Sequence, residues 1–247
     1  MTSDTPTRAD GRALDALRPT SFEIDYTEHP LGSVLCRVGR TWVLCTVCEE
    51  AGVPRFLQGK GTGWVTAEYA MLPGATNTRS GRESARGRPS GRSQEIQRLI
   101  GRSLRAIVDF EALGERTLQV DCDVLQADGG TRCASITGAS VALQIAAARL
   151  LARGDVVENP LSGSVAGVSV GIVGGHVMLD LPYEEDSRAA VDMNVIATGA
   201  GRFVEVQGTG EDGTFSSEQL ARMTELALRG TAELTRLQAE AVAKAAT

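Results

Sequence analysis

Short runs in which apolar and polar residues alternate occupy much of the first fifty positions. These runs cover residues 21–27, 33–38 and 41–48, and Gly or Pro residues lie between or beside them. A period of two residues places every second side chain on the same face, which is typical of a β-strand. We therefore expect three strands here. The Gly- and Arg-rich stretch at residues 59–92 has no regular period and is expected to be irregular.

The hydrophobic period changes to that of a helix after Gln94, where apolar residues recur at intervals of three and four. A strand-like run follows at 117–125, and a loop at 126–130 leads into a run of small residues at 131–152. We expect this run to form a second helix that ends at Gly154, because glycine readily adopts the left-handed conformation of a helix C-terminus. The apolar face of the first helix consists of Ile96, Leu99, Ile100, Leu104, Ile107 and Val108.

The second half of the chain repeats this order of strands followed by a helix. Strands are expected at 163–173, 176–181, 189–197 and 202–206, and a final helix begins at Ser216, where Ser-Ser-Glu-Gln matches a capping box. The pattern predicts an α+β fold, one domain of two related β-α halves at residues 10–153 and 154–247, with mixed sheets packed against helices. The final helix is expected to bury Leu220, Met223, Leu226, Ala227, Leu234 and Leu237.

Composition places the chain among ordinary soluble proteins. Of 247 residues, 42% are hydrophobic and 23% are charged, so the chain can bury a sizeable core. The first eleven residues are polar and contain no apolar core of a secretory signal. The most apolar stretch, residues 134–151, is interrupted by polar residues and by glycine. These features predict a cytoplasmic protein that makes no membrane contact.

Cysteine and histidine contribute little candidate chemistry. Five cysteines are an odd number, which favours reduced thiols over a disulfide framework. Cys45 and Cys48 form a C-x-x-C motif, which can indicate zinc or redox chemistry. In a strand, however, positions three apart face opposite sides, so we interpret both as small strand residues. His29 and His176 are interpreted as structural, because one lies beside a turn proline and the other follows Gly-Gly.

The charge of the chain is unevenly distributed. The formal net charge of −6 argues against a general polyanion binder, yet residues 79–105 contain eight arginines against two glutamates. Arginine recognises phosphate through paired hydrogen bonds, and the interleaved Gly and Ser residues favour close approach of a polyanion. The alternative is a solvated helix face beside a flexible loop. The arginines are Arg79, Arg82, Arg86, Arg88, Arg92, Arg98, Arg102 and Arg105.

A second candidate site is the sequence Asp-Gly-Gly-Thr-Arg at residues 128–132, between a predicted strand and a predicted helix. Unpaired backbone N–H groups at a helix N-terminus bind anions, and Gly129 and Gly130 allow close approach. Thr131 adds a hydroxyl group and Arg132 adds a positive charge. The sequence is not a Walker A loop, so a phosphate-sized anion fits it better than a nucleotide. An ordinary helix-capping turn is the alternative.

An acidic group in the second half is the third candidate. It comprises Asp180, Glu184, Glu185, Asp186 and Asp192. Asp192 lies inside an apolar strand, where a carboxylate is costly unless a cation meets it. Paired carboxylates commonly hold Mg²⁺ beside a phosphate, and such sites also accept Mn²⁺. An exposed acidic turn is the alternative, which suits Glu184 and Glu185.

Several short motifs follow one another along nearly the whole chain. They are Asp10-Gly-Arg12, Leu17-Arg-Pro19, Gly63-Trp-Val-Thr-Ala-Glu-Tyr69, Met71-Leu-Pro73, Gly91-Arg92, Glu95-Ile-Gln-Arg-Leu-Ile-Gly-Arg102, Asp121-Cys-Asp-Val-Leu-Gln-Ala-Asp-Gly-Gly-Thr-Arg132, Ser135-Ile-Thr-Gly138, Tyr183-Glu-Glu-Asp186, Val191-Asp-Met-Asn194 and Gly208-Thr-Gly-Glu211. In this order and spacing they resemble the ribonuclease PH family, which consists of phosphate-dependent 3′→5′ exoribonucleases that trim the ends of tRNA.

The resemblance implies a fold of the ribonuclease PH type, similar to domain 2 of ribosomal protein S5, in a homohexamer made of three dimers. It implies that inorganic phosphate is the co-substrate, that Mg²⁺ is the metal, and that tRNA precursors and other structured RNAs with single-stranded 3′ ends are substrates. By matched position it implies a phosphate site of Arg92, Gly130, Thr131 and Arg132, a catalytic and metal-binding pair of Asp186 and Asp192, and RNA contacts from Arg79, Arg82, Arg86 and Arg88.

One departure from the family pattern is Gly74, where members commonly have an arginine after Leu-Pro. This substitution puts in question the strength of tRNA binding or a loop contact between subunits. For the proton that the leaving 3′-oxygen needs, Asp186 is the first candidate and Asp180 the second. Two other functions stay open: a non-catalytic RNA-binding ring subunit and a metal-dependent phosphohydrolase.

Overall fold

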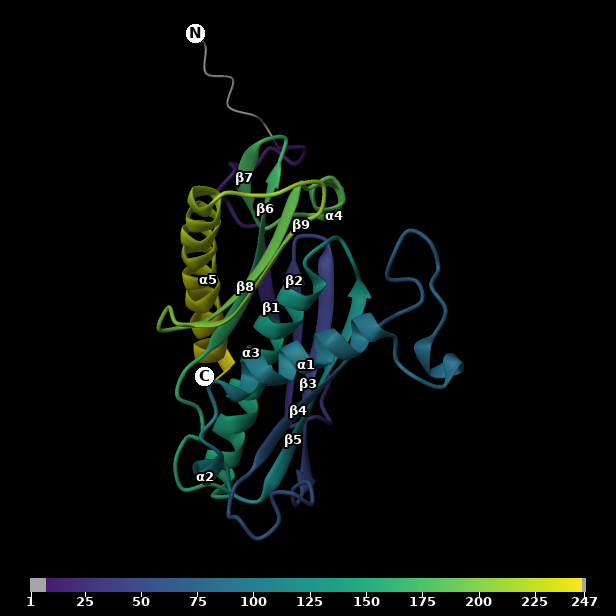
Figure 1. The fold of residues 1–247 in the computed structure, drawn as a ribbon. Helices are drawn as coiled ribbons and strands as arrows, with labels where there is room; N and C mark the ends of the chain where they lie inside the picture. Colours follow the sequence, from purple (N-terminus) through teal and green to yellow (C-terminus); the bar gives the residue numbers. More distant parts are fainter. Residues whose placement is uncertain (1–7, 246–247) are drawn as a thin grey trace.

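The computed structural model describes residues 8–245, with the exception of the side chains of Ser84 and Arg86. Two β-sheets and their helices pack into one body, and one long helix, α3 (Thr131–Arg153), lies between the sheets and contacts both (Figure 1). This arrangement confirms the predicted α+β class with sheets packed against helices, of which the first sheet is mixed.

The first sheet has five strands in the order β1-β2-β3-β5-β4. Its neighbours pair antiparallel except β4 and β5, which run parallel. Helix α1 lies in the crossover that connects these two parallel strands and packs against β4. The elements are β1 (Thr20–Ile24), β2 (Gly32–Val38), β3 (Thr41–Ala51), β4 (Trp64–Met71), β5 (Arg116–Gln126), α1 (Gly91–Arg105), the short helix α2 (Phe110–Leu113) and the 3-10 turn η1 (Glu83–Arg86).

Strand β4 corrects the expectation that residues 59–92 are irregular throughout. Within it Val65, Ala67 and Tyr69 are buried, and the residues between them are partly or fully exposed. This is the period-two pattern of a strand, but it covers only eight residues inside a longer Gly- and Arg-rich stretch. The alternation was not recognised because the loops on both sides of it are rich in Gly and Arg. The strand matters because it carries Tyr69 toward the start of α3.

The second sheet has four antiparallel strands in the order β7-β6-β8-β9. Helix α5 packs against β6, β7 and β8 and begins with the predicted capping box, in which Ser216 and Gln219 each accept a hydrogen bond from the backbone N–H of the other. Leu220, in the first turn, is 39% exposed, so its predicted burial is wrong. The elements are β6 (Val165–Val173), β7 (His176–Leu179), β8 (Val191–Thr198), β9 (Phe203–Gly210), α4 (Tyr183–Asp186) and α5 (Ser217–Ala245).

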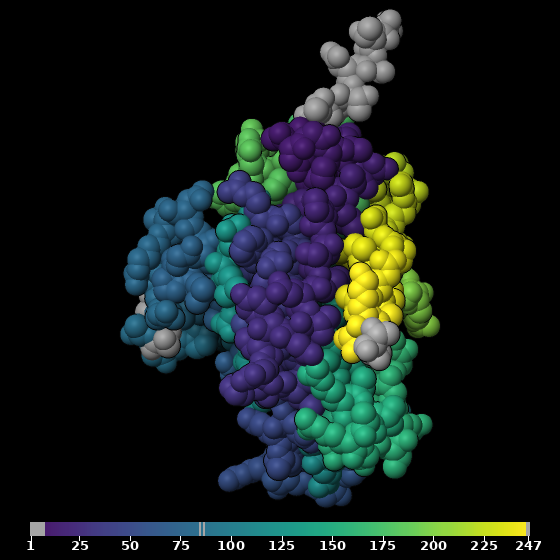
Figure 2. Space-filling view, turned by 180° about the vertical axis from the view of Figure 1, so that it is seen from behind, coloured from purple at the N-terminus to yellow at the C-terminus, as the bar shows by residue number. Residues whose placement is uncertain are grey.

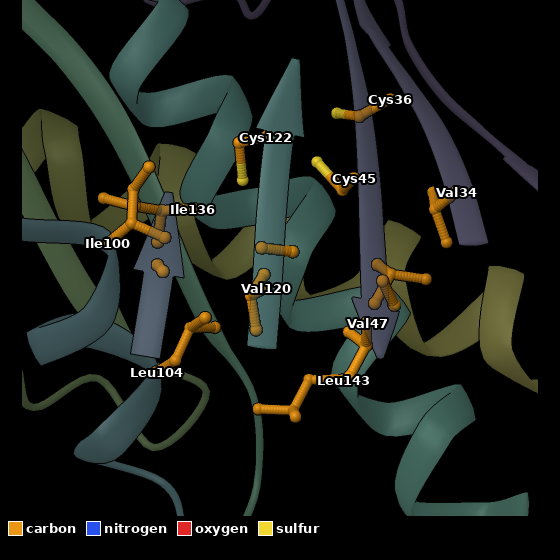
Figure 3. Close-up of a cluster of buried hydrophobic side chains, with 14 of the residues drawn as sticks. Val34, Cys36, Cys45, Val47, Ile100, Leu104, Val120, Cys122, Ile136 and Leu143 are labelled. Atoms are coloured by element: carbon orange, nitrogen blue, oxygen red, sulfur yellow. The ribbon is translucent and has the colours of Figure 1, made fainter. Parts of the chain in front are cut away.

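The main core fills the space between the first sheet and helices α1 and α3 (Figure 3). Cys36, Cys45 and Cys122 lie together there as free thiols beneath α3. Cys45 is buried and Cys48 is exposed, which confirms that the C-x-x-C residues face opposite sides of a strand. The motif therefore does not bring its two thiols together.

Helix α3 has the length and hydropathy of a membrane-spanning segment, with a mean hydropathy of 1.4. In the folded chain, however, 78% of that apolar window is buried between the two sheets. It ends at Gly154, whose left-handed backbone with φ of 76° confirms the predicted C-cap. Its apolar character is therefore explained by its central place in the core.

Close packing of β2 on α3 gives a test of this core. A side chain at Gly32 would place its Cβ 2.2 Å from the carbonyl oxygen of Ala142 in α3, a backbone atom that cannot rotate away. We expect Gly32→Ala to lower the free energy of unfolding by about 2 kcal/mol, as overpacked cores do. Chemical denaturation measures this change. Gly163→Ala is the matched control, because its Cβ would meet nothing within 4 Å, and equal stability of the two variants would contradict the packing.

Candidate active site

The turn between β5 and α3 is packed tightly against the segment that leads into α4. Gly129 and Gly130 have φ of 74° and 67°, in the left-handed region that favours glycine. A Cβ on Gly129 would lie 2.7 Å from the backbone oxygen of Leu181 and the backbone nitrogen of Tyr183. Gly130 caps α3 without any side-chain hydrogen bond to the helix. The first N–H groups of α3 therefore have no side-chain cap, and the turn before them lies against the segment that leads into α4, as an anion site between the two would require.

A buried ion pair fixes this turn against the second half of the chain. Arg18 donates to the carboxylate of Asp180 from its backbone N, Nε and Nη2 atoms, at 2.7, 3.1 and 2.6 Å. Its Nη1 atom donates to the backbone oxygen of Asp128 at 2.6 Å. Although burial alone would raise the pKa of Asp180, the Arg18 guanidinium holds that pKa below its usual value. Asp180 is thus an ionised structural acceptor, and a lowered pKa is opposite to what a proton donor needs.

A second buried ion pair fixes helix α4. Arg8 donates from Nε and Nη2 to the two carboxylate oxygens of Glu185, at 3.0 and 2.5 Å. Its Nη1 and Nη2 atoms also donate to the backbone oxygens of Leu179 and Asp180. The exposed acidic turn therefore suits Glu184, which is exposed and pairs with Arg188, but is wrong for Glu185, which is buried. The burial of Glu185 anchors the helix that ends at Asp186.

Asp186 and Asp192 form a carboxylate pair between α4 and β8. Burial raises the pKa of Asp186, and burial together with the charge of Asp186 raises the pKa of Asp192 to about 6. The Oδ1 atom of Asp192 is buried and has no hydrogen-bond partner among the described residues. A buried carboxylate oxygen without a partner destabilises the fold. Binding of a cation or a proton to this oxygen would remove that destabilisation.

Two arginines face the carboxylate pair. Arg92, in the first turn of α1, and Arg132, in the first turn of α3, both act on Asp186 and Asp192 and lower the pKa of each, against the effect of burial. Beside Arg132, the hydroxyl of Thr131 lies 2.9 Å from the phenol oxygen of the buried Tyr69. The predicted residues Arg92, Thr131, Arg132, Asp186 and Asp192 are therefore neighbours, although they come from four different elements.

The long arginine-rich segment divides into two parts. The loop of residues 72–90 extends away from the body beyond the buried Ala75, and Arg79, Arg82 and Arg88 are exposed on it (Figures 1 and 2). The side chain of Arg86 lies outside the part that the structure describes. The loop is tied to the start of α1 by Glu83, whose Oε1 accepts from the Ser93 hydroxyl at 2.8 Å.

Two arginines of α1 form contacts inside the protein and are not part of the exposed loop. Arg102 forms an ion pair with Glu205 of β9. Arg105 donates to the backbone oxygen of Val65 at 2.9 Å, and its guanidinium lies 4.7 Å from the ring centroid of Trp64. Both side chains hold α1 against its neighbouring strands. The positive surface available to a polyanion is therefore smaller than the sequence count suggests.

Several residues around the site were not singled out by their sequence pattern. Tyr69 was missed because its strand was missed, and Gln207 because a glutamine in a strand carries no periodic signal. Arg8 and Arg18 lie outside regular elements. Tyr69 and Arg18 lie inside two of the family motifs, at residues 63–69 and 17–19, but no role was assigned to them there. For Arg8 the only signal was indirect: acidic residues close to apolar strands need cationic partners from somewhere in the chain.

The described residues contain no group of three or more His, Cys, Asp or Glu side chains placed to hold a metal ion. The site therefore offers two carboxylates at most from this chain. That number fits Mg²⁺, which commonly binds one or two carboxylates and completes its shell with water and substrate phosphate. The unpartnered oxygen of Asp192 supports the same fit.

The raised pKa of Asp192 gives a prediction about stability in metal-free buffer. Above pH 6 the Asp192 carboxylate is ionised, and its burial destabilises the folded protein. Below pH 6 the carboxylate takes up a proton in the folded protein while it is still ionised in the unfolded chain, so this destabilisation is lost. Asp192→Asn removes the charge, so we expect it to be more stable than the parent by about 2 kcal/mol at pH 8. The difference should shrink toward pH 4.

Thermal or urea unfolding at both pH values, with a chelator present, measures this difference. Asp155→Asn is a control at an exposed carboxylate far from the cleft. A variant that is equally destabilised at pH 8 and pH 4 would show that Asp192 bears no such cost.

Family models match most of the chain. The model described as "3' exoribonuclease family, domain 1" matches residues 16–148, and "3' exoribonuclease family, domain 2" matches residues 163–230. The chain is 60% identical to ribonuclease PH of Saccharopolyspora erythraea over 237 residues, which are 96% of this chain and 94% of that protein. It is 57% identical to ribonuclease PH of Bacillus subtilis over 234 residues, which are 94% and 96% of the two chains.

Solved structures share the fold at lower identity. Rice Rrp46 superposes with a TM-score of 0.77 at 19% identity, over 95% of this chain and 100% of that one. A chain of the Archaeoglobus fulgidus exosome, solved with RNA bound to its active site, superposes with a TM-score of 0.77 at 23% identity, over 92% and 91%. These similarities agree with the two-sheet architecture.

Proposed function

We propose that this chain, which belongs to the 3′ exoribonuclease family as a protein of the ribonuclease PH type, works through the cleft of Arg92, Arg132, Asp186 and Asp192. Its activity is that of a phosphorolytic 3′→5′ exoribonuclease. Such an enzyme transfers a nucleotide to phosphate, where a hydrolytic nuclease would transfer it to water. The single observation that carries the assignment of the site is the proximity of two arginines to two partly buried carboxylates, whose pKa values the arginines lower and burial raises. Cationic groups for an attacking phosphate and oxygen ligands for a metal thus lie side by side.

Inorganic phosphate is the co-substrate in this proposal. Arg92 and Arg132 supply charge, Thr131 supplies a hydroxyl, and the backbone N–H groups that follow Gly130 complete the anion site. One phosphate oxygen attacks the terminal phosphodiester in line, the bond to the 3′-oxygen of the preceding nucleotide breaks, and a nucleoside 5′-diphosphate leaves. Positioning and charge neutralisation supply most of the catalysis, because phosphate is already anionic near neutral pH. The reverse reaction adds nucleotides from nucleoside diphosphates.

Asp186 and Asp192 would hold Mg²⁺, and the same carboxylates would accept Mn²⁺. When bound, the cation neutralises negative charge on the scissile phosphate. The leaving 3′-oxygen also needs a proton. Between the two acids considered for this role, Asp186 lies in the cleft beside Arg92 and Arg132, whereas the ion pair with Arg18 keeps Asp180 ionised. Asp180 is thus assigned to positioning.

Substrate RNA reaches the cleft past the loop of residues 72–90 in this proposal. Arg79, Arg82 and Arg88 are exposed on that loop, and Arg86 belongs to the same stretch. Only ten aromatic residues occur in the chain, so contact with RNA rests on charge more than on base stacking. The substrates would be tRNA precursors and other structured RNAs with single-stranded 3′ ends, in the cytoplasm and without membrane contact.

The assembly is proposed to be a homohexamer of three dimers, a ring supported by the similarity to exosome core proteins. Within each subunit, residues 10–153 and 154–247 would be two related halves that act as one domain. The Arg18–Asp180 pair and the burial of α3 between both sheets support this interdependence. Gly74 has no atom within 4 Å of an added Cβ, so the fold itself does not require glycine there.

An assay of released products tests the proposal. With a 3′-tailed RNA, we expect nucleoside diphosphates only when phosphate and Mg²⁺ are both present. Release of monophosphates without phosphate would indicate a metal-dependent phosphohydrolase, and binding of RNA without any release would indicate a non-catalytic ring subunit. Thin-layer chromatography of end-labelled RNA separates these products. Asp192→Asn should retain RNA binding and lose product release.

The phosphate site has a separate test in Arg92. We expect Arg92→Ala to raise the KM for phosphate at least tenfold, because a charge-assisted contact to an anion is lost. Initial rates at varied phosphate and saturating RNA measure the change. Arg98→Ala is the matched control, since Arg98 lies on the same helix and is exposed. An unchanged KM for phosphate in the Arg92 variant would remove Arg92 from the site.

A further inference from the structure

The guanidinium of Arg132 is held by a glutamine that the catalytic proposal does not use. Its Nη1 atom donates to Oε1 of Gln207 at 2.9 Å and to Oε1 of Glu95 at 3.2 Å. Both side-chain hydrogen bonds of Arg132 within the described residues run through this one nitrogen. The other two guanidinium nitrogens of Arg132 therefore remain available to an anion.

The amide of Gln207 has a defined orientation. Its Nε2 atom donates to Glu95 at 3.2 Å and to Oε1 of Glu205 at 2.9 Å, while its oxygen accepts from Arg132. A flipped amide would place its NH₂ group against the guanidinium and its oxygen against two carboxylates. Every neighbour therefore favours the same orientation, with the oxygen directed at Arg132.

The bridge connects elements that are far apart in sequence. Glu95 lies in the first turns of α1 near Arg92, Arg132 begins α3, and Gln207 lies in β9. Glu205, two residues earlier in β9, is itself held by Arg102 of α1. Strand β9 thus joins the two helix starts that carry the arginines of the cleft.

We propose that Gln207 is a positioning residue that orients Arg132 toward phosphate without adding a second negative charge to that of Glu95, which already pairs with Arg132. This inference rests on the proposed function of the cleft. A neutral amide accepts a hydrogen bond and leaves the arginine its attraction for an anion. A carboxylate at the same position would hold Arg132 as well, but it would add a negative charge beside the phosphate and beside Glu95 and Glu205.

Two substitutions separate orientation from simple hydrogen bonding. Gln207→Met keeps the length of the side chain and removes the amide, and we expect it to raise the KM for phosphate about tenfold with kcat changed less than threefold. Gln207→Glu keeps an acceptor for Arg132, yet we expect it to raise that KM more than the methionine does. A role limited to fold stability predicts the reverse order or no change in KM.

The experiment measures phosphorolysis at varied phosphate with saturating RNA, together with RNA affinity and the melting temperature of each variant. Gln119→Met is the matched control, because Gln119 is a half-buried strand glutamine that donates to Glu50 on the outer face of the first sheet. It should leave the KM for phosphate unchanged.

The outcomes are distinguishable. Folded Gln207 variants with the parent's KM for phosphate overturn the positioning role, and so does a glutamate variant that equals the parent. If the methionine variant fails to fold, the glutamate variant alone decides between these results. If the parent protein shows no phosphate dependence, the proposed function fails before Gln207 enters the question.

Discussion

The arrangement of the cleft depends on the buried ion pair between Arg18 and Asp180, which lie 162 residues apart in the chain. Two buried charges are costly to desolvate, and the cost is offset only when each finds several good partners. Here Asp180 accepts three hydrogen bonds from Arg18, and the same guanidinium reaches the backbone of Asp128. One side chain therefore sets the distance between the turn before α3 and the segment before α4.

That fixed distance explains how a site with few special residues can work. The N-terminus of α3 brings Arg132 and its uncapped N–H groups, α4 brings Asp186, and β8 brings Asp192, each from a rigid element. A reaction whose nucleophile is already an anion needs charge in the right places more than it needs a strong base. The two histidines of the chain, His29 and His176, are exposed and are not among the residues of this cleft.

Periodic features were predictable from the sequence, and pairwise features were not. The capping box of α5 and the glycine end of α3 each depend on neighbouring residues, so a local pattern is sufficient to predict them. The candidate residues Arg92, Thr131, Asp186 and Asp192 came from helix starts, strand interiors and a family resemblance, and the fold brings them together. The burial of Glu185 was missed because its partner Arg8 lies 177 residues away and shares no period with it.

The same limitation applies to charge, and it changes how the arginines are understood. A count along the chain treats the arginines of residues 79–105 as one basic patch, but a guanidinium contributes to a surface field only when no neighbouring carboxylate neutralises it. Arg102 is paired with Glu205, and Arg105 packs on Trp64, so both stabilise the scaffold. In the proposed function, the charge for RNA lies on the loop and the charge for phosphate lies at the two helix starts, where Arg132 is also paired with Glu95. The acidic total of the protein is compatible with a polyanionic substrate because the loop of residues 72–90 carries four arginines and a single glutamate.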